Sequence, residues 1–275
     1  VLVGEQRAPC GGGLKSGWKA FDSQQGAFTQ LVEVAPELPS KRLNDGALDQ
    51  MGRLGSGTLD DGEKETPGSL YRLTASGPFA LDRGYVITNG PCFSPGGRVL
   101  YHTDTRAGTI FAFDVADDGS VSNKRVFVTI EAGAGHPDGS VSDAEGCVWT
   151  GLYGGWSARR YSPAGTLLST VRFACANITK LAFAGPDPQT VYPTPAREGL
   201  GEAARPQRSL RCPPPQGNFC ERPRYRFGIP PDLCGRLCGP IGCPRVGRQR
   251  RETGRIQTSS FLLHHHSSLA GRTRP

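Results

Sequence analysis

The sequence has no apolar run approaching the roughly 18 residues that a membrane-spanning helix needs, so we expect no membrane partner. Its first residues show no basic stretch followed by an apolar one, and so no secretory signal peptide is expected. Methionine occurs once, whereas glycine occurs 38 times and proline 23 times. A chain this rich in turn-forming residues favours short strands joined by turns over a helical bundle.

The cysteines of the first part of the chain lack the spacing of a disulfide framework or a metal site. Four of them, Cys10, Cys92, Cys147 and Cys175, lie far apart. Scattered thiols of this kind are typical of a reducing compartment. We therefore expect a cytoplasmic protein.

Lysine is absent from residues 196–275, which hold 15 arginines and only five acidic residues. Residues 1–195 hold 17 basic and 20 acidic residues, so the positive charge of the chain is concentrated at its end. Five cysteines also crowd into this end (Cys212, Cys220, Cys234, Cys238 and Cys243). The composition divides the chain into a folded domain over residues 1–197 and an Arg/Pro/Cys-rich tail over residues 198–275, irregular or disordered.

A glycine followed by alternating apolar positions recurs along the first part. Such phrases begin at Gly17, Gly68, Gly108 and Gly155, at intervals of 51, 40 and 47 residues. Short strands that repeat at this interval indicate a β-propeller with about four strands per blade. A β-sandwich is the structural alternative, although it would not repeat one phrase at one interval. We predict an all-β, incomplete propeller with about four recognisable blades over residues 10–197.

A second repeated phrase is a turn followed by a strand. It reads "DQMGRLGSG" from Asp49, "SPGGRVLYHTD" from Ser94 and "DAEGCVWTG" from Asp143. Aspartate at the head of such a turn accepts hydrogen bonds from backbone amides two residues on, so Asp143 is predicted to be structural. Asp138, five residues earlier, has no counterpart in the other copies. The repeat therefore does not explain Asp138.

Three polar segments are predicted to lie just outside strands: "RLNDG", "ITNGP" and "HPDG". Loops on one face of a propeller converge on its central channel, so residues from successive blades can meet there. Asn89 offers a neutral oxygen and Asp138 an anionic one, and hard divalent cations such as Ca²⁺ and Mg²⁺ prefer oxygen ligands. Taken singly, each Asn-Gly or Asp-Gly pair favours an ordinary turn residue over a metal ligand.

The set of motifs resembles the gluconolactonase/regucalcin (senescence marker protein) family. "RLNDGALDQMGRLGSGTLDDGE", "ITNGPCFSPGGRVLYHTDT" and "PDGSVSDAEGCVWTGLYGGWSARRYSP" follow the order and spacing of that family, from about Gly12 to Arg197. The resemblance implies a six-bladed propeller that hydrolyses a sugar lactone, as a carboxylic ester hydrolase. It also implies one divalent metal ion (calcium, zinc, manganese or magnesium) as cofactor and a small-molecule sugar lactone as partner.

The same resemblance assigns roles to five residues. Asn89 and Asp138 match two of the family's three metal ligands, and Asp138 would also take a proton from the attacking water. Arg42 and Asn44 match its substrate-binding pair. Glu63 falls near a further substrate-contacting carboxylate, one position out of register, with a solvated loop acid as the alternative. His102 is predicted to be a packed strand residue, and His136 is given no role.

The chain departs from the family at both ends. The third metal ligand, a glutamate in a "GE(G/S)PxW" setting, has no match, because Glu5 is followed by neither proline nor tryptophan at those places. We therefore expect an N-terminally truncated propeller whose site keeps two protein ligands and binds metal weakly. Near the other end, "VYPTPAREGL" places two prolines where the family has a strand that pairs with its neighbours.

Beyond about residue 198 the repeat is lost, and we interpret the tail as frame-shifted or unrelated sequence. Two other interpretations of it remain. Cys234, Cys238 and Cys243 are a possible zinc site, at irregular spacing. The arginine excess suggests nucleic-acid binding but lacks interleaved aromatic residues and a known module, so no nucleic-acid partner is expected. For the domain itself, a calcium-binding propeller without turnover is the alternative to a lactone hydrolase.

Overall fold

The structure is a computed structural model that describes residues 10–14, 17–22, 25–34, 40–62, 68–184 and 190–197. The predictions for Glu5, Glu63 and residues 198–275 lie outside the described residues. Within these ranges the regular secondary structure consists of 17 strands and no helix. Accordingly, no helix in the described ranges is long and apolar enough to span a membrane. The prediction of an all-β chain is confirmed for this part.

The strands form five antiparallel sheets in chain order. The first sheet has three strands, the next three have four strands each, and the last has two. Their bounds are β1 Cys10–Leu14, β2 Gly17–Asp22 and β3 Ala27–Val32; β4 Lys41–Leu48, β5 Leu54–Asp60, β6 Gly68–Thr74 and β7 Gly77–Tyr85; β8 Thr88–Phe93, β9 Val99–Asp104, β10 Thr109–Val115 and β11 Val121–Thr129; β12 His136–Ser142, β13 Val148–Tyr153, β14 Ser157–Tyr161 and β15 Leu167–Arg172; β16 Asn177–Ala184 and β17 Thr190–Ala196.

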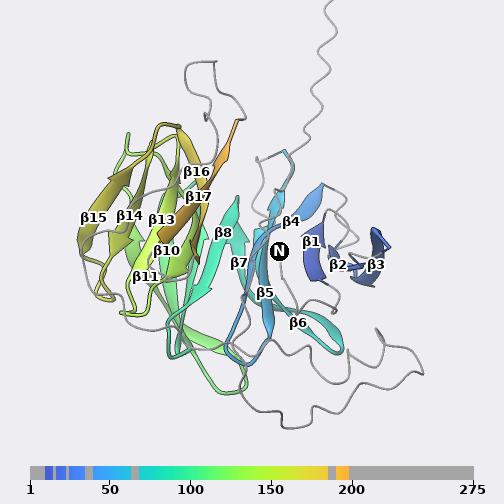
Figure 1. The fold of residues 1–275 in the computed structure, drawn as a ribbon. Coiled ribbons are helices and arrows are strands. Elements are labelled where there is room, and N and C mark those ends of the chain that lie inside the picture. Colours follow the sequence, from blue (N-terminus) through green and yellow to red (C-terminus); the bar gives the residue numbers. More distant parts are fainter. Residues whose placement is uncertain are drawn as a thin grey trace, which may run out of the picture.

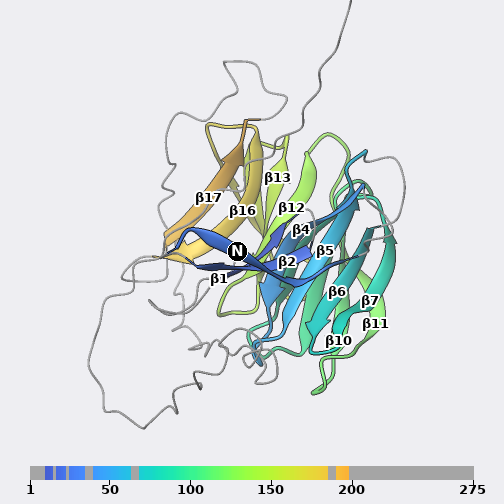
Figure 2. The same ribbon diagram turned by 90° about the vertical axis from the view of Figure 1, so that its right-hand side faces the viewer.

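Successive sheets lie side by side through their first strands. β4 contacts β8, β8 contacts β12, and β12 contacts β16. Figures 1 and 2 show the sheets following one another from β1–β3 (dark blue) to β16–β17 (yellow to orange). The repeated phrases of the sequence thus correspond to repeated antiparallel sheets, and β4, β8, β12 and β16 form a row in the interior. We call these four the inner strands.

The core lies between the sheets, and each of the three four-stranded sheets is covered on both faces by its neighbours. Trp18 and Leu43 join the first and second sheets in one buried cluster. Trp149 and Ile178 do the same for the fourth and fifth sheets. A strand covered on both faces does not alternate apolar and polar residues, which is why five of the six residues of β13 are buried.

The repeated turns have the structure that the sequence predicts. Asp49 and Asp143 are both buried, and the Oδ1 atom of each accepts hydrogen bonds from the amides two and four residues later. Gly52 and Gly146 close the two turns at φ 78° and 79°, a conformation that glycine adopts without strain. The structural role of Asp143 is confirmed.

The last described strand, β17, continues through Pro193 and Pro195. Proline lacks a backbone N–H, and two prolines two positions apart face the same edge of a strand. Among the described strands β17 pairs only with β16, so it is an edge strand, where proline is tolerated.

Candidate functional site

The three polar segments lie inside the inner strands, and the expectation that they lie just outside strands is wrong. Each inner strand breaks register with its partner at the same level: between Leu43 and Gly46 in β4, Asn89 and Cys92 in β8, Pro137 and Ser140 in β12, and Ile178 and Lys180 in β16. Such β-bulges bend a strand and redirect its side chains. Four neighbouring strands thus place irregular backbone and polar side chains together.

Asn44 and Asn89 are in direct contact. The Asn44 amide nitrogen, Nδ2, lies 2.8 Å from Asn89 Oδ1 and 2.8 Å from the carbonyl oxygen of Thr88. Asn89 in turn donates from Nδ2 to Thr105 Oγ1 at 2.9 Å. These donors fix the orientation of both amides. They direct Asn89 Oδ1 toward β4 and leave Asn44 Oδ1 as the atom through which Asn44 accepts further hydrogen bonds.

Arg42 lies next to this pair. Its Nε donates to Asp61 Oδ1 at 2.8 Å, and its Nη1 donates to Asn44 Oδ1 at 3.3 Å. Arg42 is half-buried, so part of the guanidinium group contacts solvent. The structure therefore brings Arg42, Asn44 and Asn89 together. Glu63, the remaining predicted substrate contact, is outside the described residues.

Asp138 lies in the bulge of β12 and is partly buried. Burial raises the pKa of its carboxyl group well above the usual value, and the nearby Asp45 carboxylate raises it further. The Lys180 ammonium and the Gly139 N–H act on this pKa in the opposite direction. Among the described residues no side chain hydrogen-bonds or ion-pairs with Asp138. A carboxyl group in this environment gains from accepting a proton or a cation.

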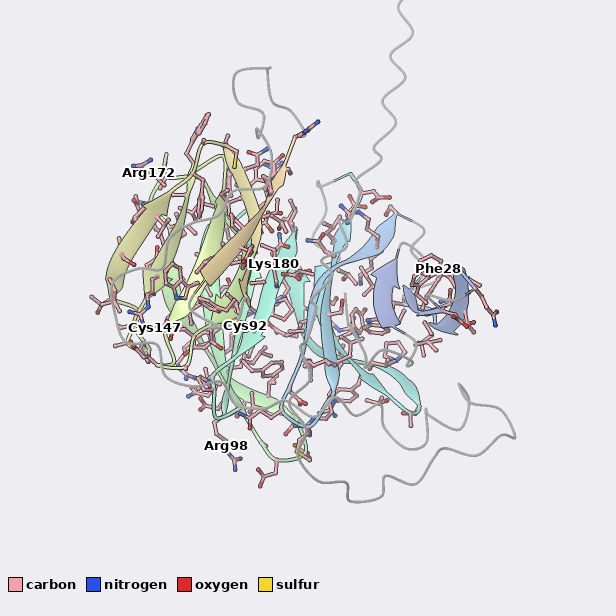
Figure 3. All side chains as sticks on the ribbon, in the orientation of Figure 1. Phe28, Cys92, Arg98, Cys147, Arg172 and Lys180 are labelled. Atoms are coloured by element: carbon pink, nitrogen blue, oxygen red, sulfur yellow. The ribbon has the colours of Figure 1, made fainter. Side chains whose placement is uncertain are left out.

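Asp45 and Lys180 belong to the site but were given no role from the sequence. Asp45 Oδ1 accepts from the Gly46 amide at 2.8 Å, and Oδ2 accepts from the Gly90 amide at 3.0 Å and from Lys180 Nζ at 2.5 Å. Figure 3 shows Lys180 in the middle of the molecule, between the sheets. Asp45 was visible beside Asn44, but Lys180 is 135 residues away along the chain, and no local pattern points to it.

Gly139 allows the Lys180 side chain to cross β12. A Cβ atom at Gly139 would lie 2.3 Å from Lys180 Cδ and 2.5 Å from the carbonyl oxygen of Thr179. Both distances are shorter than atoms of a folded protein tolerate. The glycine of "PDG" is therefore required by the close approach of β16 to β12, and not by a turn.

His102 lies in β9, and the prediction that it is a packed strand residue is confirmed. The side chain is fully buried and makes a T-shaped contact with Tyr85 at 4.7 Å between ring centroids. Burial lowers the pKa of His102 to about 3, so the ring is neutral near pH 7. Neither ring nitrogen has a hydrogen-bond partner in the described part of the chain.

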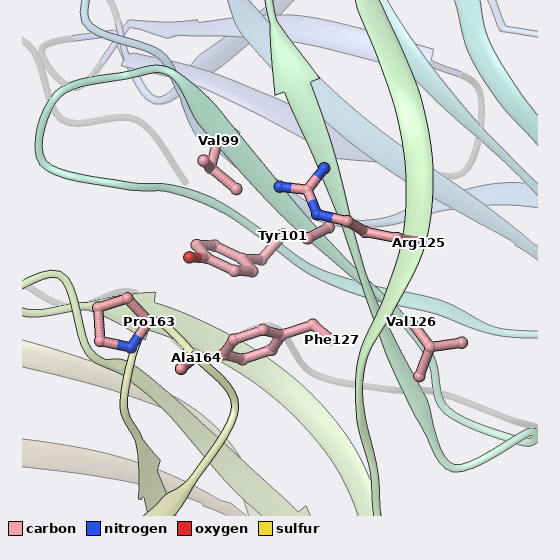
Figure 4. A pocket seen from close by; sticks show the side chains of 8 residues that line it. Val99, Tyr101, Arg125, Val126, Phe127, Pro163 and Ala164 are labelled. Carbon is pink, nitrogen blue, oxygen red and sulfur yellow. The ribbon is translucent and has the colours of Figure 1, made fainter.

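A separate hollow of about 260 Å³ lies between the sheet of β8–β11 and the turn at Pro163 and Ala164. Figure 4 shows Tyr101 and Phe127 side by side in it, with Arg125 at its edge. The Arg125 guanidinium already pairs with Asp114 at 2.8 Å. The lining includes no carboxylate and no histidine, and burial raises the pKa of its tyrosine, Tyr101.

Residues 12–197 match the family described as SMP-30/Gluconolactonase/LRE-like region. The chain is 37% identical over 198 residues to an L-arabinolactonase from Azospirillum brasilense, covering 70% of this chain and 64% of that protein. It is 31% identical over 187 residues to a 6-deoxy-6-sulfogluconolactonase from Pseudomonas putida, covering 67% and 64% of the two chains. The chain thus spans just under two thirds of the length of these relatives.

The structure of regucalcin from Agrobacterium tumefaciens, described as a calcium-binding protein, superposes on this chain with a TM-score of 0.73. The two chains are 28% identical, and the superposition covers 82% of this chain and 78% of regucalcin. The family match covers the same residues over which the sequence motifs run. The chain belongs to the SMP-30/gluconolactonase/LRE-like family.

Proposed function

We propose that the protein hydrolyses a sugar lactone of the aldonolactone type, such as gluconolactone, to the sugar acid. The observation that carries the proposal is that Asn89 and Asp138 lie at the register breaks of the adjacent strands β8 and β12, with Asn44 bonded to Asn89 and Arg42 bonded to Asn44. Two relatives of similar sequence are named lactonases, which supports the reaction class. Among the described residues Cys92, Cys147 and Cys175 are free thiols, which supports the cytoplasmic location that we also propose.

A divalent cation fits the site in part. Asp138 is a carboxyl group with a raised pKa and no side-chain partner among the described residues, and Asn89, on the adjacent inner strand, offers a buried neutral oxygen that also accepts a hydrogen bond from Asn44. Both are ligands that hard cations prefer. The described residues contain no group of three His, Cys, Asp or Glu side chains that would hold a metal alone. We propose that Asn89 and Asp138 hold the ion, which would supply Lewis-acid polarisation of the lactone carbonyl.

Asp138 is the proposed general base. Burial raises the pKa of this carboxyl group in the absence of an ion, which makes it a stronger proton acceptor than an exposed aspartate, whereas a bound cation would lower the pKa again. It would accept a proton from the water that attacks the carbonyl carbon and return that proton to the ring oxygen as the C–O bond breaks. The product is then a hydroxy acid, whose carboxyl group, formed from the ester carbonyl and the water oxygen, releases its proton to solvent.

Arg42 and Asn44 are the proposed substrate contacts. Both Asn44 N–H groups are engaged by Thr88 and Asn89, so Asn44 is expected to accept a hydrogen bond from a sugar hydroxyl through Oδ1. Arg42 is expected to donate to the substrate from the guanidinium group that it already holds against Asn44. A donor and an acceptor side by side suit vicinal hydroxyl groups, which can both donate and accept.

The experiment is to measure acid release from gluconolactone and xylonolactone, corrected for spontaneous hydrolysis, with and without added Ca²⁺, Mg²⁺, Mn²⁺ or Zn²⁺. Asp138→Asn keeps the size of the side chain but removes the base, and should lower kcat by about 100-fold or more. Asp117→Asn, at a site whose side chain is 89% exposed, is the matched control and should leave the rate unchanged. Normal turnover by the folded Asp138→Asn protein would show the proposed mechanism to be wrong.

A calcium-binding propeller without turnover is the second candidate, because the superposed regucalcin is described as a calcium-binding protein. The same oxygens can hold an ion without catalysing a reaction. Calcium binding that Asp138→Asn abolishes, with no acid release from either lactone, would favour this second function.

A further inference from the structure

The Asp45–Lys180 ion pair crosses the row of inner strands. Asp45 is in β4 and Lys180 is in β16, and the two strands are separated by β8 and β12. Lys180 Nζ lies 2.5 Å from Asp45 Oδ2, with side-chain exposures of 33% for Lys180 and 18% for Asp45. The pair is thus shielded from water but is not fully buried.

The backbone around this pair is built to receive it. The Gly90 amide of β8 donates to the same Asp45 oxygen at 3.0 Å, and the Gly46 amide donates to the other at 2.8 Å. Gly139 of β12 leaves the space that the Lys180 methylene groups occupy. Four strands therefore contribute to placing one ammonium group beside the bulge that carries Asp138.

Electrostatics connect this ammonium group to the proposed metal ligands. Both charged side chains lie beside the backbone next to Asp138, because a Cβ atom at Gly139 would lie 2.3 Å from Lys180 Cδ and 3.2 Å from Asp45 Oδ2. Next to Asp138 lie one further carboxylate, that of Asp45, and the Lys180 ammonium group that it holds, whereas the Arg42 guanidinium is paired with Asp61. A metal ion held by Asn89 and Asp138 would be attracted by Asp45 and repelled by Lys180.

We infer that Lys180 determines the metal affinity of this site: its ammonium group, held by Asp45 across β12, weakens the binding of divalent cations at Asn89 and Asp138. The inference rests on the metal site of the proposed function. Removing the cation alone leaves the site one charge more negative, whereas removing both members of the pair restores the balance. Repulsion between partly shielded charges is much stronger than between charges in water, because little solvent screens them.

The test is to titrate the purified full chain with CaCl₂ and separately with MnCl₂ by isothermal calorimetry, in the absence of any lactone. Lys180→Met keeps the length and apolar stem of the side chain without its charge, and should lower the Kd by about tenfold or more, equivalent to ~1.4 kcal/mol. Lys180→Arg retains the charge and should keep the Kd within about twofold of the wild-type value. Circular dichroism and thermal melts establish that each variant is folded.

Lys180→Met also leaves the Asp45 carboxylate without its ionic partner, and this change could itself alter metal affinity. A second comparison therefore removes the Asp45 charge from both proteins. Asp45→Asn is compared with Asp45→Asn/Lys180→Met, in which both side chains are neutral. The double variant should again bind Ca²⁺ about tenfold more tightly than the single one. If Lys180 only holds β4 and β16 together and does not repel the metal ion, neither comparison should show a gain in affinity.

The outcomes separate this inference from the proposed function. An unchanged or weakened affinity in both Lys180→Met comparisons, with Asp138→Asn abolishing binding, overturns the inference and leaves the metal site in place. If neither the wild type nor any variant binds metal, the inference is also overturned. Lactone hydrolysis by the wild type would then show that the reaction does not require this metal site. Detection of binding only after the ammonium group is removed supports the inference.

Discussion

Replacement of Asp143 by alanine is expected to destabilise the fold strongly without altering the chemistry of the site. The side chain is 2% exposed and accepts four hydrogen bonds. Two come from the amides of Glu145 and Cys147, at 3.0 and 2.9 Å. The other two come from Trp149 Nε1 at 2.9 Å and Arg160 Nε at 2.8 Å.

The expected loss follows from what alanine leaves behind. Trp149 is 1% exposed, so its indole N–H would remain buried without an acceptor. The Arg160 guanidinium, 15% exposed, would lose its ion pair with Asp143 and keep the one with Glu145, whose side chain is 43% exposed. Removing one member of a buried ion pair costs about 3–5 kcal/mol. For a domain of 150–250 residues each kcal/mol lowers Tm by about 2–4 °C, which gives a decrease of roughly 6–20 °C.

Urea unfolding followed by tryptophan fluorescence, together with thermal melts, measures this effect. Asp143→Asn retains an oxygen for the turn amides and loses the acceptor for Trp149 and Arg160, so it should fall between alanine and wild type. Asp117→Ala is the matched control, because Asp117 and its partner Arg98 are 89% and 67% exposed. Such an exposed pair contributes about 0–1 kcal/mol.

The reasoning fails if Asp143→Ala is no less stable than Asp117→Ala. In that case the buried hydrogen bonds of Asp143 contribute no more than a surface pair. Metal binding by the folded Asp143→Ala protein should match the wild type, because the side chain faces the turn and not the inner strands. A loss of metal binding at unchanged fold would contradict the separation between Asp143 and Asp138.

Two further predictions concern buried groups of the inner part of the fold. Because the folded pKa of His102, about 3, lies below its ordinary value of 6.5, the stability linked to this group is present above pH 6.5 and is lost as the pH falls toward 3. Lowering the pH from about 7.5 to about 4.5 should therefore cost the wild type about 2–3 kcal/mol more than His102→Leu, measured as urea midpoints, and equal pH dependence would show the assignment to be wrong. Gly139→Ala should destabilise the protein by about 1–3 kcal/mol, because its Cβ would lie 2.5 Å from the Thr179 carbonyl oxygen. Gly96→Ala, where no atom lies within 4 Å of the added Cβ, is the control, and equal melting temperatures of the two variants would refute the argument.

The fold was predictable where the signal is local and periodic. The glycine phrases at Gly68, Gly108 and Gly155 precede or begin strands β6, β10 and β14, because turn residues and alternating apolar positions specify a strand within a few residues of themselves. Asp143 was assigned correctly for the same reason, since its role repeats that of Asp49. Whether the sheets close into a ring, and how residues 198–275 are arranged, remain predictions.

The placement of "RLNDG", "ITNGP" and "HPDG" outside strands was wrong for a physical reason. Glycine, asparagine and aspartate favour turns, and the same preferences suit a β-bulge in the interior of a sheet. Bulges interrupt a strand by one or two residues and leave its pairing on both sides intact, as in β12 around Asp138. Composition alone does not distinguish the two.

The sequence by itself determined the strand-rich class, the repeat, the family and the residues that the motifs share, among them Asn89 and Asp138. Only the tertiary structure decided that Asn44 holds Asn89, that Gly139 makes room for a side chain from β16, and that Lys180 reaches Asp45. The reason is distance along the chain: strand formation depends on neighbours a few residues apart. The charge of the site depends on residues 135 positions apart, which meet because four bulged inner strands lie side by side.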